Sequence, residues 1–305
     1  GTLHLSGDNS IVYNTGATSK VYVSGYSSTI HNTGIVYASG TTFAIDNKDT
    51  VWATGNLITV NSYDFAKAFV TGNYITVADG DHILINMGLA RVTGNKIFIT
   101  GGNNEVSGQR VYITGYSSTI TNAGGDIYIT GYTNTVTTNA AGGRIFITGD
   151  NTTVASSSGT LNITGSVTVI AANVVNMSGD NTVTTAEKVV NMSGINTVTT
   201  AQGKVTASGI NTITTAEANV HASGINTITT AQGVVNMTGV NTVTTANDKV
   251  VMTGTNTVTT ANGTVYASGT NTITTANGTV NASGVNTITT AEGTVNASGI
   301  NTITT

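Results

Sequence analysis

The sequence predicts an all-β protein, a single long parallel β-solenoid of about 20 coils, and two observations lead to this prediction. First, a glycine recurs at one constant interval in the C-terminal half, at positions 179, 194, 209, 224, 239, 254, 269, 284 and 299. Second, apolar residues alternate with polar ones inside each repeat, as where Val258 stands between Thr257 and Thr259. Alternation is the period of a strand, in which successive side chains point to opposite faces.

Each repeat is expected to contain two short strands. It reads Gly-x-Asn-Thr-[Val/Ile]-Thr-Thr-Ala-x-x-x-Val-x-[Ala/Met]-[Ser/Thr], which is rich in the β-branched residues that suit a pleated surface. The Gly-x-Asn and Ala-x-x-x segments between the strands carry residues typical of turns. The composition is poor in helix formers, and the glycine spacing together with the absence of proline excludes collagen.

Stacking of the coils follows because one coil of two short strands cannot bury its own apolar face. Near-identical neighbours about 4.8 Å away would bury it. This predicts inner columns that begin at Val183, Ala186 and Val190 and recur once in every repeat. The asparagines that begin at Asn181 form either a hydrogen-bonded amide ladder or a series of separate turns.

The first part of the chain contains the same two-strand repeat, but its corner residues are less regularly spaced. Successive corner residues there are unevenly spaced, as at Gly7, Gly25 and Gly40, and Met87 takes the place of one glycine. We therefore expect irregular coils with longer loops over residues 1–178, continuous with regular 15-residue coils over 179–305. The extra residues are expected in surface loops near Gly16–Lys20, Tyr63–Lys67 and Asn139–Gly143.

Composition limits the partners. Charged residues make up 8% of the chain and the net charge is -4, so no basic patch predicts a nucleic-acid partner. No cysteine is present for disulfides or thiolate metal sites, and no apolar run predicts a membrane span or a signal peptide. The chain begins at Gly1 and stops at Thr305, halfway through a coil, which favours end-to-end association or a longer parent protein.

Catalytic, cofactor-binding and metal sites are not expected. The four histidines, His4, His31, His82 and His221, are far apart in the sequence and therefore along a solenoid. Two interpretations are open for Asp79, Asp81 and His82: their side chains ligate a metal ion, or the segment is simply a turn. A polysaccharide-degrading enzyme would need several acidic side chains that face one cleft. One group of acids is dense enough in the sequence, and its members are either such a site or solvated charges on loops: Asp46, Asp49, Asp64, Asp79 and Asp81.

An aromatic stripe is predicted on the outside of the first part. The stripe is formed by the residue at the second position of the first strand of each coil, and its rings either contact sugars or a partner chain or stack on one another. Its members are Tyr22, Tyr37, Trp52, Phe69, Phe98, Tyr112, Tyr128 and Phe146.

Paired threonines give the sharpest signal in the second part. Each pair brackets an inward Val or Ile, so both hydroxyls are expected to point outward: Thr182 and Thr184, Thr197 and Thr199, Thr212 and Thr214, Thr227 and Thr229, Thr242 and Thr244, Thr257 and Thr259, Thr272 and Thr274, Thr287 and Thr289, Thr302 and Thr304. These rows resemble those of insect β-solenoid antifreeze proteins, and the resemblance implies ice binding by the threonines. The cysteines that staple many of those insect proteins are absent here.

The repetitive, cysteine-free composition rich in Thr, Asn and Gly also resembles the shafts of bacterial surface adhesins and phage tail fibres. From uniform repetition without a convergent catalytic set, we expect a non-catalytic structural protein, either a filament subunit or the shaft of an extracellular, cell-surface or virion fibre. Its partners would be further copies or neighbouring fibre subunits. Ice binding is the first alternative, with ice or a cell-surface glycan as ligand. A polysaccharide-binding or polysaccharide-degrading β-helix is the second.

Overall fold

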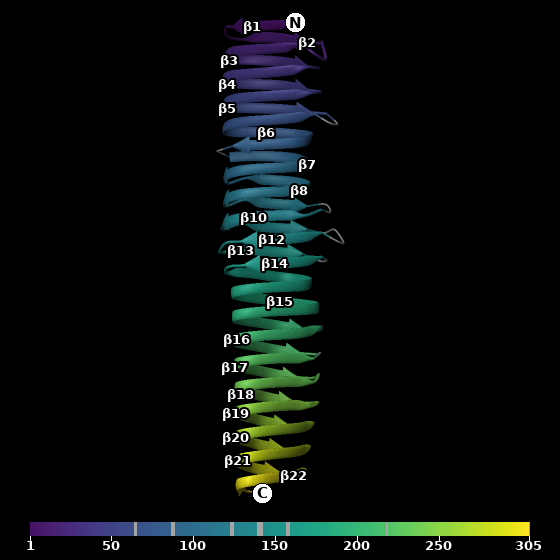
Figure 1. The fold of residues 1–305 in the computed structure, drawn as a ribbon, viewed down its shortest axis with the longest axis vertical. Coiled ribbons are helices and arrows are strands. Elements are labelled where there is room, and N and C mark those ends of the chain that lie inside the picture. Colours follow the sequence, from purple (N-terminus) through teal and green to yellow (C-terminus); the bar gives the residue numbers. More distant parts are fainter. Residues whose placement is uncertain are drawn as a thin grey trace. The chain divides into compact units, whose positions relative to one another are not determined.

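The chain is an all-β parallel β-solenoid with about 18 turns, close to the predicted number. The computed structural model describes residues 1–63, 66–86, 89–122, 125–138, 143–156, 159–217 and 219–304, and no helix occurs among them. The chain divides into two compact units, Gly1–Gly159 and Thr160–Thr305. In each unit the strands lie on one another as successive turns (Figure 1). The predicted change to regular coils after residue 178 falls inside the second unit and remains a prediction.

The strands of the first unit are short where turns interrupt the coil and longer where the ladder continues around a corner. They are β1 (Thr2–Ser6), β2 (Ser10–Asn14), β3 (Lys20–Asn32), β4 (Ile35–Asn47), β5 (Thr50–Ser62), β6 (Lys67–Asn86), β7 (Leu89–Gly102), β8 (Glu105–Tyr116), β9 (Thr119–Asn122), β10 (Ile127–Tyr132), β11 (Thr135–Thr138), β12 (Arg144–Thr148) and β13 (Thr152–Ser156).

The second unit is more uniform, and from β16 onward each assigned strand covers most of one coil. The strands are β14 (Thr160–Thr164), β15 (Val167–Ala201), β16 (Lys204–Ala216), β17 (Val220–Ala231), β18 (Val235–Ala246), β19 (Val250–Ala261), β20 (Thr264–Ala276), β21 (Thr279–Ala291) and β22 (Thr294–Ile303).

Stacking is parallel and in register within each unit. In the second unit Val205 pairs with Val220 and Thr212 with Thr227, the residues at the same positions of the next repeat. In the first unit Tyr22 pairs with Tyr37 in the same way. Equal positions of neighbouring coils therefore lie directly on one another, and each residue type becomes a column.

The predicted inner columns of the second unit are confirmed. Val198, Val205 and Ala201 are fully buried, and so are nearly all the residues that follow them at 15-residue intervals up to Ile288. The side chain of Ala186 lies outside the described residues. Burial of a valine or isoleucine on every coil, at about 1.5–3 kcal/mol each, is the main favourable term that holds neighbouring coils together.

The asparagine ladder of the second unit is also confirmed. Asn196, Asn211 and Asn226 are 1–2% exposed. Each donates a side-chain hydrogen bond to the asparagine of the next coil, with donor to acceptor distances of 2.8–2.9 Å. The ladder runs from Asn181 to Asn301. It satisfies the polar groups of the buried corner, which would otherwise cost about 1–3 kcal/mol each.

The first coils of the first unit place their buried amides at a different corner, whereas its later coils bury Asn104 and Asn134 just after the corner glycine. Asn14, Asn32 and Asn47 form a ladder at the C-terminal end of the second strand of their coils, with bonds of 2.7 and 2.9 Å. At the corner where the second unit has asparagine, the coils of β4 and β5 bury Phe43 and Ile58. The apolar side chains fill the space that an amide would occupy, so the polar column moves across the coil.

Two backbone solutions turn the corner between the strands. In the second unit the glycine itself has a positive φ, between 96° and 120° from Gly179 to Gly299. Several coils of the first unit insert one extra residue in the left-handed conformation after the glycine, as at Asn103 and Ser117, with φ of 58° and 52°. The predicted loop at Gly16–Lys20 lies between β2 and β3, where Ser19 N donates to Gly16 O. Residues 64–65 and 139–142 of the other two predicted loops, and Met87, lie outside the described residues.

Candidate functional surfaces

The predicted threonine pairs lie on the outer side of the second unit. All of them are exposed except Thr242 and Thr257, which are half-buried. The first member of each pair is in register with its neighbours, as Thr197 with Thr212 and Thr212 with Thr227. The expected spacing of these hydroxyls is about 4.8 Å between coils and about 6.6 Å along the strand. They form two regular columns of hydroxyl and methyl groups.

A third column beside the threonines was not predicted from the sequence. It occupies the position after each corner glycine and exposes large aliphatic side chains, with Ile195 at 51% and Val240 at 50%. From Ile195 onward it contains Ile195, Ile210, Ile225, Val240, Thr255, Thr270, Val285 and Ile300. Its signal was present in the sequence, because the variable residue of Gly-x-Asn is Ile or Val in six of these eight coils.

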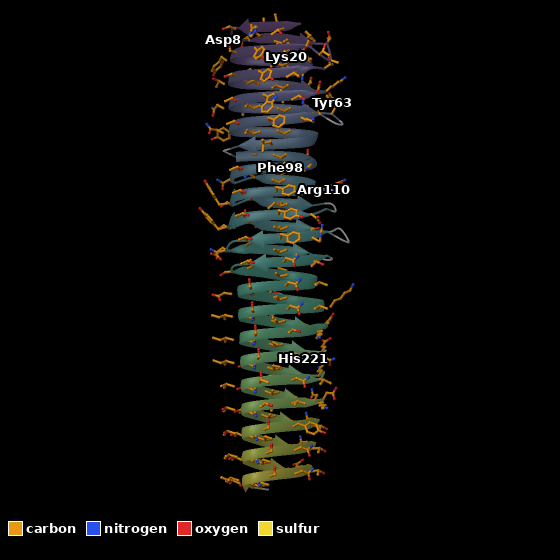
Figure 2. All side chains as sticks on the ribbon, in the orientation of Figure 1. Asp8, Lys20, Tyr63, Phe98, Arg110 and His221 are labelled. Carbon is orange, nitrogen blue, oxygen red and sulfur yellow. The ribbon has the colours of Figure 1, made fainter. Side chains whose placement is uncertain are left out.

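The predicted aromatic stripe forms two stacks in the first unit. One contains His4, Tyr22, Tyr37, Trp52 and Phe69, with ring centroids 4.0–6.4 Å apart. The other contains Phe98, Tyr112, Tyr128 and Phe146, with centroids 4.6–4.8 Å apart, and Figure 2 labels Phe98. The rings are nearly parallel, so each covers the face of its neighbour. A sugar would therefore meet ring edges and hydroxyls along the stripe rather than open ring faces.

Trp52 is the test of this stacking, because it lies between Tyr37 and Phe69. We expect Trp52→Ala to lower the free energy of unfolding of the first unit by about 1–3 kcal/mol, through the loss of two ring contacts and of buried area. Urea unfolding followed by circular dichroism measures the change. Tyr26→Ala removes a ring that is 61% exposed and serves as the control. Equal effects of the two substitutions would show that the stack contributes nothing.

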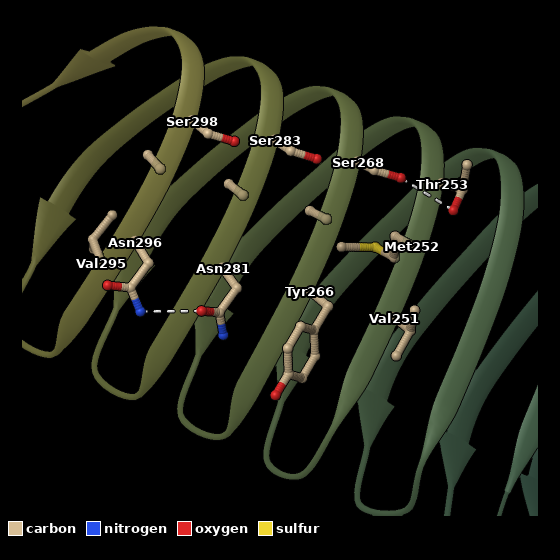
Figure 3. A pocket seen from close by; sticks show the side chains of 13 residues that line it. Val251, Met252, Thr253, Tyr266, Ser268, Asn281, Ser283, Val295, Asn296 and Ser298 are labelled. Atoms are coloured by element: carbon tan, nitrogen blue, oxygen red, sulfur yellow. Dashed lines mark hydrogen bonds between the residues drawn. The ribbon is translucent and has the colours of Figure 1, made fainter.

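Shallow grooves follow the outer side of the first strand in both units. In the second unit the residues that line a groove of about 710 Å³ include Ala267 and Ala282. Tyr266 and Asn281 lie along one side of it and Ser268 along the other (Figure 3). Asn296 Nδ2 donates to Asn281 Oδ1 at 3.0 Å along the first of these sides. A similar groove of about 460 Å³ in the first unit runs beside the rings from His4 to Trp52. These grooves offer hydroxyls and amides but repeat the same groups from coil to coil.

Of the five clustered aspartates, only Asp46 and Asp49 have side chains among the residues that the structure describes. Asp46 Oδ2 lies 2.9 Å from His31 Nδ1 on the coil before it. Asp49 accepts a hydrogen bond of 3.0 Å from the Thr50 hydroxyl. Asp64 and the side chains of Asp79, Asp81 and His82 lie outside the described residues. The two described acids are each engaged by a neighbour, and no group of three or more metal-binding side chains occurs among the described residues.

Ion pairs elsewhere also join neighbouring coils. Arg144 Nη2 lies 2.7 Å from Asp126 Oδ2, and the hydrogen bond from the guanidinium lowers the pKa of that carboxyl. Arg91 Nε lies 2.6 Å from Glu105 Oε2 and lowers the pKa of Glu105 in the same way. Both carboxyls are kept ionised, which suits cross-coil pairing rather than proton transfer near neutral pH.

Comparison with known proteins gives no relative: no family model, no curated protein and no solved structure matches the chain. Among the described residues no helix is long and apolar enough to cross a membrane.

Proposed function

We propose that the chain is a non-catalytic structural protein, a filament subunit or the shaft of an extracellular, cell-surface or virion fibre. One observation carries the proposal: within each unit, equal residues of successive coils pair in register, so that chemical groups are repeated along the stack. Catalysis instead requires unlike groups that converge on one reacting atom. Repetition of this kind supplies length and stiffness, since every added coil buries the same apolar surface and continues the same ladders.

Electron microscopy of the intact chain over a range of concentrations tests the proposal. We expect unbranched particles of uniform width that assemble into fibres as concentration rises. Assays of ice growth and of glycan cleavage should both be negative. Compact particles at every concentration, together with activity in either assay, would overturn the structural role.

Ice binding is a second candidate, and the exposed threonine columns favour it. An ice-binding face must present regularly spaced groups, and the in-register pairing of Thr197, Thr212 and Thr227 supplies that regular spacing. If this candidate holds, Thr227→Lys should reduce thermal hysteresis several-fold. Thr206→Lys, at an exposed position on the other strand of the coil, should leave it unchanged. Absence of hysteresis in the unaltered protein would remove the candidate.

A further inference from the structure

The surface with the strongest unexplained chemistry is the three-column face of the second unit, which we call the aliphatic–threonine face. It consists of the column from Ile195 to Ile300 and the two threonine columns from Thr197 to Thr302 and from Thr199 to Thr304. Its aliphatic members are 46–72% exposed, and its columns contain no charged residue. The ammonium of Lys249, on a nearby turn, lies 5.2 Å from the ring centroid of Tyr266 on the first strand. Exposed aliphatic side chains on six of eight successive coils mark an interaction surface.

We infer that this face binds a second copy of the chain, side by side and antiparallel. The inference rests on the proposed structural role and specifies its interface. A second copy has the same coil spacing by construction, so its columns stay in step with these over every coil. Neither surface carries charge, so no charged group would lose its hydration without a partner.

The order of residues in the aliphatic column specifies the register. From Ile225 to Ile300 it reads Ile, Val, Thr, Thr, Val, Ile, which is a palindrome centred between Thr255 and Thr270. A two-fold axis in the interface, perpendicular to the stacking direction and passing through that centre, places each column on the same column of the second copy. It sets Val240 against Val285 of the second copy and Thr255 against Thr270, so apolar groups meet apolar groups and hydroxyls meet hydroxyls. This is an isologous contact, the common form of a two-fold dimer.

The predicted interface is small. Six coils at about 4.8 Å and three columns at about 6.6 Å give a patch of about 30 Å by 15 Å, or about 900 Å² buried in total. Interfaces of this size are at the weak end of specific association. The pairing should therefore be examined at about 0.5 mM protein, and by a method that traps it.

Disulfide trapping is well suited to the chain, because it contains no cysteine of its own. Val240→Cys and Val285→Cys are prepared separately, mixed and oxidised. In the inferred pair the two thiols oppose each other, whereas two copies of Val240→Cys place theirs about 14 Å apart, three coils along the stack. A disulfide requires Cα atoms about 4.4–6.8 Å apart. We expect about tenfold more cross-linked dimer in the mixture than in either variant alone, because opposed thiols have a high effective concentration.

A mixture of Ile225→Cys and Ile300→Cys should cross-link in the same way. Adding Val240→Lys to both of these variants should abolish their cross-link, and adding Thr206→Lys, outside the face, should not. Equal cross-linking in single-variant samples, or none in the mixture, would overturn the inference. Monomers that slow ice growth would assign the face to ice instead. Fibres seen by microscopy without the cross-link would refute the pairing alone, and cross-linked pairs that never form fibres would refute the structural role alone.

Discussion

Replacement of Gly224 by alanine is expected to disrupt the second unit strongly, as replacement of the equivalent glycine of a neighbouring coil would. Gly224 has a φ of 107°, a conformation that side chains rarely adopt. An added Cβ would also lie 2.1 Å from the carbonyl oxygen of Gly209 on the coil before it. The two coils would have to separate, which breaks their ladder. We expect a loss of about 3–5 kcal/mol in the free energy of unfolding.

Hydrogen exchange locates this effect, because a solenoid can lose one contact between coils while the others persist. Amide protection should fall in the coils on either side of Gly224 and remain near Val280. The adjacent substitution Ser223→Ala removes only an exposed hydroxyl and should change stability by less than about 0.5 kcal/mol. Unchanged protection in Gly224→Ala would mean that the coils are not packed as closely as described.

Asn226→Ala is expected to have the second largest effect. Asn226 Nδ2 donates to Asn241 Oδ1 at 2.8 Å and to Thr238 O at 3.2 Å, and Asn226 Oδ1 accepts from Asn211 at 2.8 Å. Alanine would leave the Asn211 donor and two acceptors without these partners in a buried corner. The expected loss is about 2–4 kcal/mol, measured by urea unfolding.

A matched control exists on the surface. Asn262 belongs to an exposed ladder, in which it donates to Asn247 and accepts from Asn277, both at 2.9 Å. Water can replace these bonds, so Asn262→Ala should cost less than about 1 kcal/mol. If both alanine variants lost the same stability, the buried ladder would have no special role in holding the coils together.

The 15-residue period predicted the columns of the second unit because stacking leaves each position only one environment. Once Val205 is inside, Val220 and Val235 must be inside as well. The same logic placed the threonines outside. It does not identify the aliphatic column, because the residue after the glycine belongs to a Gly-x-Asn turn segment, where any side chain is tolerated. In the structure Ile210 lies within β16, directly before the buried Asn211, and its side chain is 46% exposed.

The first unit was less predictable, and its corners show why. Phe43 and Ile58 fill the corner where the second unit has asparagine, and the amides of Asn32 and Asn47 then lie at another corner. Volume filling decides between these arrangements, and it depends on several coils at once. Likewise, the corners at Asn103 and Ser117 each contain one extra residue, and that residue is left-handed. The irregular spacing of the glycines shows that a coil is longer but not where in the coil the extra residue lies.

The buried asparagine ladder gives the second unit an electrical direction. From Asn181 to Asn301 each amide donates toward the C-terminal coil, so the side-chain dipoles add head to tail along the interior. The series starts at Asn181 Oδ1, which has no hydrogen-bond partner among the described residues. The exposed ladder of Asn247, Asn262 and Asn277 donates in the opposite sense. Two copies lying antiparallel would set their interior dipoles against each other and cancel the field that a parallel bundle would accumulate.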